Sequence, residues 1–321
     1  MSAPTPLLAL VGPTASGKTE AAFLIAGRLG AEVVSVDSML VYRGMDVGTA
    51  KPTTEQRERV PHHLIDLAEP EEAFSVARFQ ELAFGAIRGI RARGRTPLLV
   101  GGGGLYYRAV VDRLDFPGTD PPIRELLLTE ASAVGAEGLY RRLSSLDPVA
   151  AGRIEPGNVR RTVRALEVAA ITGRPFSSYA EAWERFPTGA VRAAGIRLDR
   201  RDLRERIERR VEDMLPGLAA ETEALMARGS GGFLTSSQAI GYAEMVACLE
   251  GRMTRSEAAA STVRRTNALA RRQMAWLRRD PRIRWFDAGP EGALGAAGPV
   301  AEYLAGGEPD TDEGGMGGTG A

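Results

Sequence analysis

A stretch near the start of the chain has the composition and spacing of a phosphate-binding loop. It reads GPTASGKT and satisfies G-x-x-x-x-G-K-[ST] between a strand-like apolar run at 7–11 and a helical pattern at 19–29. Backbone N–H groups of such a loop converge on phosphate oxygens, the lysine reaches a terminal phosphate, and the threonine ligates Mg²⁺. The motif leaves open which polyphosphate binds. It predicts a diphosphate site formed by Gly12, Thr14, Ala15, Ser16, Gly17, Lys18 and Thr19, with Thr19 as the metal ligand.

An acidic residue, Asp37, follows the next strand-like run, at 32–36. Ligands of an open parallel sheet bind beyond the carboxyl ends of its strands, so we expect Asp37 to face the same crevice as the phosphate loop. Three roles compete: a cap on the following turn, a carboxylate that supports Mg²⁺ through a bound water, and a base acting on an acceptor substrate. Spacing alone does not separate the last two roles.

Lysine is almost absent from the chain and occurs only at positions 18 and 51, whereas every other basic residue is arginine. Genomic base composition explains the general bias. The two exceptions suggest sites that need a compact ammonium group rather than a planar guanidinium fork.

Composition limits the classes of protein that the chain can be. With 321 residues, 44% of them hydrophobic, it is long enough for one large domain or two ordinary ones. A single cysteine and two histidines exclude a disulfide framework and a Cys/His metal cluster, so any metal must have oxygen ligands. No apolar run approaches the roughly 20 residues of a membrane span, and no basic segment precedes the first apolar run; we therefore expect a cytoplasmic protein.

Strand-like and helix-like patterns alternate over the first hundred residues, which predicts an α/β fold with a parallel sheet. The expected strands are 7–11, 32–36 and 97–100, and the expected helices are 19–29 and 76–91. After the loop DFPGTDPPI the pattern is helical, and Asn158 and Gly173 mark the two ends of one helix. A strand-like segment returns at 193–200, and helical patterns then continue to about residue 279.

These patterns predict a P-loop NTPase-like parallel-sheet core with an inserted, mainly α-helical domain. The core is expected at 1–114 and, with basic C-terminal helices, at 193–289; the inserted domain is expected at 115–192. The segment 290–321 is Gly-rich and acidic, and we expect it to bury too little apolar surface to fold.

Two groups of arginines have the spacing of a polyanion-binding surface. Residues 252–284 contain ten arginines and two acidic residues, and arginine pairs recur at 264/265, 271/272 and 278/279. A seven-residue repeat drifts only about 20° per step on an α-helix, so the pairs form one stripe. A solvated helix face is the plainer interpretation, contact with a polyanion is the other, and part of the stripe could clamp a diphosphate. Arg160, Arg161 and Arg164 share a helical face in the inserted domain.

Seven segments, taken together, carry a resemblance to a known family. In order, the chain resembles the signature blocks of tRNA dimethylallyltransferases over about residues 5–287, with GPTASGKT at 12–19, VDSMLVYRGMDVGTAKP at 36–52, HHLID at 62–66, GGGGLYYRAV at 101–110, RRTVRALEV at 160–168, QAIGYAEM at 238–245 and ARRQMAWLR at 270–278. These enzymes place an isopentenyl group on the adenine beside the anticodon.

The resemblance implies that the phosphate loop and Mg²⁺ hold dimethylallyl diphosphate, and that Asp37 and Lys18 are catalytic. A carboxylate that accepts a proton from the exocyclic N6 of adenine makes this poor nucleophile more reactive, while lysine, amides and metal stabilise the departing diphosphate. The implied tRNA-contacting residues are Asp37, Ser38, Met39, Leu40, Gly103, Arg124, Arg160, Arg161, Thr162, Val163, Arg164, Gln238, Ala239, Ile240, Gly241, Tyr242 and Ala243, and the stripe adds Arg271 and Arg272.

Three positions depart from the family pattern. Leu40 stands where the family has glutamine, Gly103 where it has threonine, and Asn267 where it has arginine. Reaching the adenine requires unstacking it, and the possible stacking partners, which are more often core residues, are Tyr42, Phe74, Tyr106, Tyr107 and Tyr242. Lys51 either holds a loop or approaches an RNA phosphate.

Two other functions fit the same phosphate loop. A small-molecule kinase would use ATP with Asp37 as base for a hydroxyl acceptor, and a non-catalytic RNA-binding protein is a weaker alternative. The resemblance favours a prenyltransferase that binds tRNA through its anticodon stem-loop and acts as a monomer.

Overall fold

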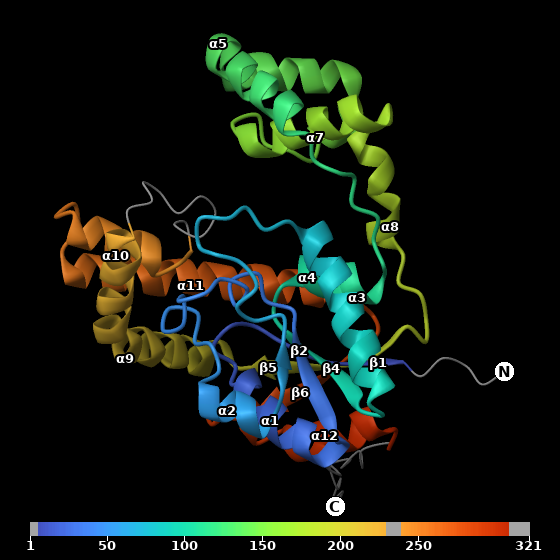
Figure 1. Ribbon diagram of the computed structural model, residues 1–321, viewed down its shortest axis with the longest axis vertical. Coiled ribbons are helices and arrows are strands. Elements are labelled where there is room, and N and C mark those ends of the chain that lie inside the picture. The colour runs from blue at the N-terminus through green and yellow to red at the C-terminus, as the bar shows by residue number, and fades with distance from the viewer. Residues whose placement is uncertain (1–5, 229–238, 308–321) are drawn as a thin grey trace, which may run out of the picture. The chain divides into compact units, whose positions relative to one another are not determined.

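The computed structural model describes residues 6–228 and 239–307. These residues form two compact units (Figure 1). The core unit is Met1–Tyr107 with Thr188–Ala321, and the helical unit is Arg108–Pro187.

The core unit is built on a six-stranded sheet in which every pairing is parallel and the strand order is β3-β2-β4-β1-β5-β6. The predicted α/β class with a parallel sheet is therefore confirmed. The strands are β1 (Leu7–Val11), β2 (Ala31–Ser35), β3 (His62–His63), β4 (Thr96–Gly101), β5 (Val191–Leu198) and β6 (Ile283–Ala288). Sequence patterns missed β3 and β6, because the first is very short and the second, IRWFDA at the edge of the sheet, shows no regular alternation of apolar and polar residues.

Two helices distant in sequence cover one face of the sheet. Helix α1 (Lys18–Leu29) packs with α12 (Ala297–Ala305), and their apolar side chains form one cluster with alternate residues of the strands, such as Leu8, Leu10 and Ile196. Residues at alternate positions of a strand point to the same face, so the strands contribute every second residue to this cluster. Helix α3 (Val76–Ala92) packs against β2 and β4.

The prediction that 290–321 does not fold was wrong for its first part. Residues 292–294 form a 3-10 turn (η3, Gly292–Leu294), and α12 follows with Val300 and Leu304 almost fully buried against α1. The prediction used the average composition of 290–321, and that average does not reveal the short amphipathic helix AGPVAEYLA within it. Residues 308–321 lie outside the described part of the chain.

The core unit contains further helices, three of which begin at a side-chain cap. The further helices are α2 (Thr54–Arg59), α9 (Arg200–Ala227), α10 (Tyr242–Leu249) and α11 (Arg255–Leu277), and α4 (Gly104–Val111) leads into the helical unit. Thr254 and Glu257 form a capping box at the start of α11, and Asp199 caps α9. Helices α9, α10 and α11 pack against one another (Figure 1).

The helical unit contains α5 (Pro121–Leu146), α6 (Pro148–Ala151), α7 (Val159–Thr172), η1 (Phe176–Tyr179) and α8 (Glu181–Glu184). Asn158 caps α7 through a hydrogen bond from Arg161 N–H, and Gly173 ends it in the left-handed conformation, as predicted. Leu139, Leu143 and Leu166 lie in its apolar core.

The observed limits of the helical unit differ from the predicted range 115–192. Val191 and Arg192 belong to β5, where they pair with β1. At the other limit, the Arg108 guanidinium donates hydrogen bonds to the carbonyls of Ala182, Trp183 and Arg185, which ties the end of α4 to the helical unit. The Pro/Gly loop used as a sequence marker lies inside the unit.

Candidate active site

The phosphate loop connects β1 to α1 and has the backbone conformation that its glycines allow. Gly17 adopts φ 82°, and Ala15 also has a positive φ of 63°. Left-handed conformations of this kind turn successive N–H groups toward one point, which prepares the loop for an anion at the N-terminus of α1. The predicted context of the motif, between a buried strand and a helix, is therefore present.

Lys18 is the first residue of α1 and lies over the loop. Its ammonium group donates hydrogen bonds to Pro13 O (2.5 Å) and Ser16 Oγ (3.3 Å). Burial lowers the pKa of Lys18 to about 8, although the negative charge of Asp37 opposes this shift. A lysine in this state carries a charge at neutral pH and releases it a few pH units earlier than an exposed lysine does.

Asp37 lies two residues after the end of β2, at the same sheet edge as the phosphate loop. Its Oδ1 accepts a hydrogen bond from Met39 N–H at 2.8 Å, so the carboxylate caps the following turn. Its negative charge acts to raise the pKa values of Lys18, Tyr106 and Arg210. Asp37 and the phosphate loop leave the same edge of the sheet, and the expectation that they face one crevice stays a prediction.

Two arginines of α9 reach the phosphate loop, and no motif or spacing in the sequence singles them out. Arg206 Nε donates to Ala15 O at 2.9 Å, and Arg210 Nη1 lies 3.4 Å from Thr14 Oγ1. Burial lowers the pKa of Arg210, and the nearby Asp37 and Glu20 carboxylates counteract this effect. The four-residue spacing puts both arginines on one helix face. Many arginine pairs in this chain have the same spacing, so the spacing alone does not identify these two.

A run of four glycines at 101–104 lies close to the phosphate loop, since a Cβ at Gly102 would lie 2.7 Å from Gly12 O. A Cβ at Gly102 would lie 2.6 Å from Gln273 Nε2, and one at Gly104 would lie 3.0 Å from Trp276 Cβ, so α11 approaches the backbone closely. Gln273 also accepts a hydrogen bond from Thr14 N–H at 2.8 Å. At Gly103, where the family has threonine, a Cβ would lie 3.2 Å from Val36 O. Packing at this position is tight but less so than at its neighbours.

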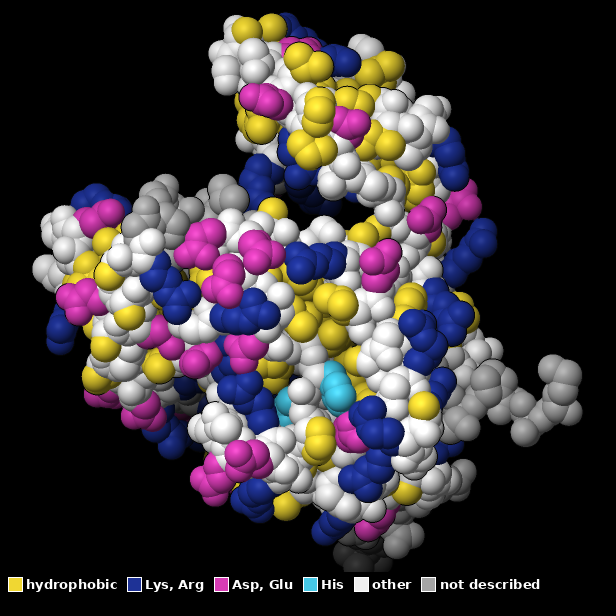
Figure 2. Space-filling model, in the orientation of Figure 1, with side chains coloured by type: hydrophobic (Ala, Val, Ile, Leu, Met, Phe, Trp, Pro, Cys, Tyr) yellow, Lys and Arg dark blue, Asp and Glu magenta, His cyan; other side chains and the backbone are white. Residues whose placement is uncertain are grey.

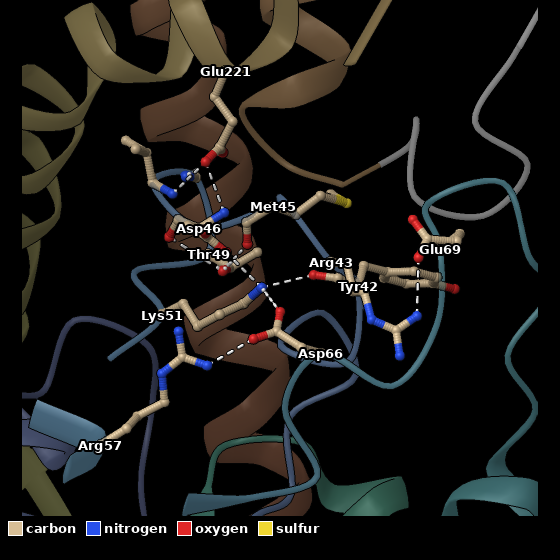
Figure 3. Close-up of polar contacts among 12 residues, drawn as sticks. Tyr42, Arg43, Met45, Asp46, Thr49, Lys51, Arg57, Asp66, Glu69 and Glu221 are labelled. Atoms are coloured by element: carbon tan, nitrogen blue, oxygen red, sulfur yellow. Dashed lines mark hydrogen bonds and ion pairs between the residues drawn. The ribbon is translucent and has the colours of Figure 1, made fainter. Parts of the chain in front are cut away.

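Lys51 is a structural residue that organises the loop after Asp37 (Figure 3). Its ammonium group, 1% exposed, donates to Tyr42 O and Asp66 Oδ1 at 2.7 Å each and pairs with Asp46 Oδ1 at 2.6 Å. Although burial opposes ionisation, hydrogen bonds from Lys51 and Arg57 keep the pKa of Asp66 below its ordinary value. Of the two roles weighed for Lys51, the structure supports loop holding.

The arginine pairs of the stripe differ in their surroundings. Arg265 pairs with Glu244 at 2.6 Å, whereas Arg271 and Arg272 are exposed on α11 and have no ion-pair partner within the described part of the chain. Arg278 and Arg279 follow the end of α11, where the Arg279 guanidinium lies 5.9 Å from the centre of the Trp276 ring. Acidic and basic side chains are interspersed over the face of the core unit seen in Figure 2, so the neutral net charge is not divided into single-sign surfaces there.

In the helical unit, the predicted arginines fall into two groups. Arg160 and Arg161 are exposed at the start of α7. Arg124 and Arg164 each pair with the buried Glu167 at 2.7 Å and keep its pKa low against the effect of burial. The side chains of their neighbours Thr162 and Val163 are buried. Only Arg160 and Arg161 among these residues are presented to solvent without a protein partner in the described residues.

The remaining predicted residues lie around the N-terminus of α10. Gln238 lies outside the described residues, Ala239 and Tyr242 are buried, and Ile240 and Ala243 are half-buried. Among the candidate stacking partners, Tyr42, Phe74, Tyr107 and Tyr242 belong to the core, and Tyr106 is half-buried against Phe79. Burial raises the pKa of Tyr106, with Tyr42 and Asp37 adding to the effect.

Within residues 6–228 and 239–307 there is no group of three His, Cys, Asp or Glu side chains that could hold a metal ion. Thr19 is half-buried in the first turn of α1, and Asp37 lies close to the same loop. In those residues, no helix is both long enough and apolar enough to cross a membrane.

Comparison with protein-family models gives two matches. The model described as IPP transferase matches residues 40–280, and the model described as Isopentenyl transferase matches residues 5–67. Proteins named tRNA dimethylallyltransferase are among the most similar relatives. The one from Salinispora arenicola is 49% identical over 91% of this chain and 85% of its own length, and the one from Kineococcus radiotolerans is 49% identical over 93% and 96%.

Solved structures give the same result. A tRNA isopentenylpyrophosphate transferase from Bacillus halodurans is 41% identical, with a TM-score of 0.68, and the match covers 94% of this chain and 96% of that one. A eukaryotic dimethylallyltransferase described as acting on tRNA has a TM-score of 0.76 at 22% identity, over 96% of this chain and 82% of that one, which shows a shared fold.

Lys51→Met is expected to destabilise the protein by about 2–3 kcal/mol, because it leaves the Tyr42 carbonyl and one oxygen of Asp66 without their donor. Lys51→Arg is expected to cost about 1–3 kcal/mol, because a planar fork is too large for this buried space. Denaturant unfolding measures both values. The matched control is Arg57→Met, which removes the outer partner of the same Asp66 and should cost less than about 1 kcal/mol because Arg57 is partly exposed. Equal losses at positions 51 and 57 would contradict the structural role of Lys51.

Proposed function

This chain belongs to the IPP transferase family, and we propose that it transfers a dimethylallyl group from dimethylallyl diphosphate to N6 of the adenosine 3′ to the anticodon in tRNA. The observation that carries the proposal is the placement of Asp37 and the phosphate loop at one edge of the parallel sheet, with Arg210 reaching the loop at Thr14. A base and a diphosphate site must lie across one crevice if an amine is to attack an allylic carbon. Its relatives are prenyltransferases, and this does not favour the kinase alternative.

The diphosphate half of the site is formed by the phosphate loop and two cations. Backbone N–H groups of the loop 12–19, which include those at the N-terminus of α1, donate hydrogen bonds to the phosphate oxygens. Lys18 and Arg210 neutralise charge that grows on the leaving diphosphate as the C–O bond breaks. Arg206 supports the loop through Ala15 O instead of facing the ligand directly.

The residues at the loop fit Mg²⁺. This cation keeps several waters and is held by few protein oxygens together with substrate phosphates, which agrees with a lone Thr19 hydroxyl beside a carboxylate. When bound, Mg²⁺ would supply Lewis-acid stabilisation to the diphosphate. Thr19 would hold it through its hydroxyl, and the Asp37 carboxylate would support it from the same edge of the sheet.

Asp37 is the base of the proposed reaction. Its Oδ1 is engaged by Met39 N–H, which orients the carboxylate and leaves Oδ2 for the amine. The N6 amine forms a bond to the allylic carbon, the carbon–oxygen bond to diphosphate breaks, and the N6 proton passes to the carboxylate. Turn capping and general-base action are thus compatible roles of one side chain.

The proposed acceptor is the anticodon stem-loop of tRNA, bound by a monomer of this chain. Arg271 and Arg272 on α11 and Arg160 and Arg161 on α7 are exposed cations suited to phosphate contacts, which position an RNA without reading its sequence. The ion pairs of Arg124 and Arg164 with Glu167 give these two residues a structural role as well.

Transfer of radiolabel from dimethylallyl diphosphate to unmodified tRNA, with Mg²⁺ present, tests the proposal. We expect tRNA-dependent incorporation and release of diphosphate. Asp37→Asn should lower kcat by about 10²–10⁴-fold, because the proton acceptor is lost. Its tRNA affinity should stay within a few fold of the original.

Two controls make this test decisive. ATP consumption with a small acceptor, and no transfer to tRNA, would identify a kinase and overturn the proposal. A loss of tRNA affinity in Asp37→Asn as large as the loss of rate would assign Asp37 a structural role only.

The pH dependence of donor use is expected to report Lys18. Because the pKa of Lys18 is about 8 in the free protein, its charge is present below that pH and is lost above it. Initial rates at low donor concentration should therefore show kcat/KM for dimethylallyl diphosphate falling as pH rises through about 8. Bound diphosphate raises the pKa of the lysine, so the fall in kcat should begin at higher pH. In Lys18→Arg the cation persists at every pH tested, and a fall near pH 8 that remained in this variant would assign the titration to another group.

Replacing Arg271 and Arg272 by alanine is expected to weaken tRNA binding and its salt dependence. Each lost phosphate contact lowers the slope of log affinity against log salt by about 0.7–0.9, so the double variant should lose about 1.5. Filter binding at several salt concentrations measures the slope. The matched control replaces Arg28 and Arg88, exposed arginines of α1 and α3, and should leave the slope unchanged. Equal slopes for both double variants would show that the arginine stripe is an ordinary solvated helix face and does not contact RNA phosphates.

A further inference from the structure

One carboxylate on α9 holds a turn of the loop that follows Asp37. Glu221 accepts hydrogen bonds from the backbone N–H groups of Asp46 (2.8 Å), Val47 (2.9 Å) and Gly48 (3.4 Å), and Figure 3 shows its side chain reaching down to this turn. Successive N–H groups that converge on one point form an anion-binding concavity. Here the anion is supplied by the protein itself, from a residue more than 170 positions away in the sequence.

Close packing leaves this turn little freedom to move. The Tyr242 hydroxyl also donates to Glu221, and its ring lies against Gly48 so closely that a Cβ there would be 2.4 Å from Cε2. On α9, a Cβ at Gly217 would lie 3.3 Å from Val47 Cγ1. Tyr242 is 1% exposed. The 46–48 turn is therefore held between α9 and α10, at one position along the axis of α9.

The clamped turn is connected to Asp37 by a short series of hydrogen bonds. Asp37 Oδ1 accepts from Met39 N–H, and Met39 O accepts from Tyr42 N–H at 3.3 Å. Tyr42 O accepts from the Lys51 ammonium, which also pairs with Asp46 in the turn (Figure 3). A displacement of the turn is thus transmitted to the backbone that carries the base.

The same helix holds the phosphate loop at another point. Arg206 and Arg210 of α9 contact Ala15 O and Thr14 Oγ1. Glu221 follows Arg210 by eleven residues, which is about three turns and about 16 Å along a helix. A residue three turns further along faces nearly the same side. Helix α9 therefore contacts the donor loop with one part of its length and the loop after the base with another.

We propose that Glu221 is a positioning residue for the transfer reaction: by anchoring the 46–48 turn to α9, it fixes the separation between Asp37 and the diphosphate-binding loop. The inference rests on the proposed function. A misplacement of about 1 Å between reacting groups can cost about 100-fold in rate. Loss of the anchor should therefore affect the chemical step, while the diphosphate loop, held separately by Arg206 and Arg210, keeps its affinity for the donor.

The test compares Glu221→Ala, Glu221→Gln and the control Glu223→Gln, an exposed carboxylate on the same helix. Single-turnover transfer at saturating donor and tRNA is expected to slow about 10–100-fold in Glu221→Ala, with KM for dimethylallyl diphosphate within twofold. Glu221→Gln retains an oxygen acceptor for the turn and should recover most of the rate. Glu223→Gln should match the unsubstituted protein.

Hydrogen exchange separates the anchor from the reaction. Amides of residues 46–48 should exchange at least about tenfold faster in Glu221→Ala than in Glu223→Gln, with or without substrates. Faster exchange with an unchanged single-turnover rate would show that the anchor serves folding alone and would overturn the proposal, as would a rate loss that Glu221→Gln does not recover. No transfer by the unsubstituted chain would overturn the proposed function and leave the exchange result standing. If Glu221→Ala does not fold, Tyr242→Phe takes its place, since it removes one hydrogen bond to Glu221 and should slow transfer to a smaller degree. An unchanged single-turnover rate in Tyr242→Phe would then overturn the proposal.

Discussion

Parallel pairing of β2, β4 and β1 is the constraint on which the site depends. Because the three strands run in one direction, the loops after β1, β2 and β4 leave the same edge of the sheet. These loops carry the phosphate-binding residues, Asp37 and the glycine run at 101–104. The loop of the proposed diphosphate site and the Asp37 carboxylate are thereby brought to one edge of the sheet. An antiparallel β2 would place Asp37 at the opposite edge.

Sequence reasoning recovered what depends on local patterns. The phosphate loop has a fixed spacing and a recognisable context, and Asn158 and Gly173 mark a helix whose ends need only neighbouring residues. Asp37 was found because it directly follows a buried strand. Two edge strands were missed because β3 is too short to show a periodicity and β6 does not alternate apolar and polar residues. Helix α12 was missed because averaging over a long acidic, Gly-rich segment concealed nine residues with one apolar face.

Residues that support the site from a distance could not be found this way. The helices α9 and α11 contain many similar charged or polar residues. The few that matter here are distinguished only by their contacts with the phosphate loop or with the 46–48 turn; they are Arg206, Arg210, Glu221 and Gln273. The partners of Arg164 and Arg265 are likewise tertiary: Glu167 and Glu244 become visible as partners only when the helices have packed. A charge pattern in the sequence predicted a surface of arginines, but packing decides which of them remain available for RNA.

The distribution of lysine and arginine follows the geometry of the acceptors. At position 51, one carbonyl and two carboxylates converge on a single nitrogen in a nearly closed space, and a compact ammonium with three donors satisfies them. At position 18, the ammonium lies against a carbonyl and a hydroxyl of the loop that would receive phosphate. A guanidinium presents its donors in a plane and spreads its charge over a larger volume, so it suits Arg206, Arg210 and the exposed face of α11, where acceptors are separated. In a chain that otherwise uses arginine, lysine is retained at the two places where several acceptors surround one point.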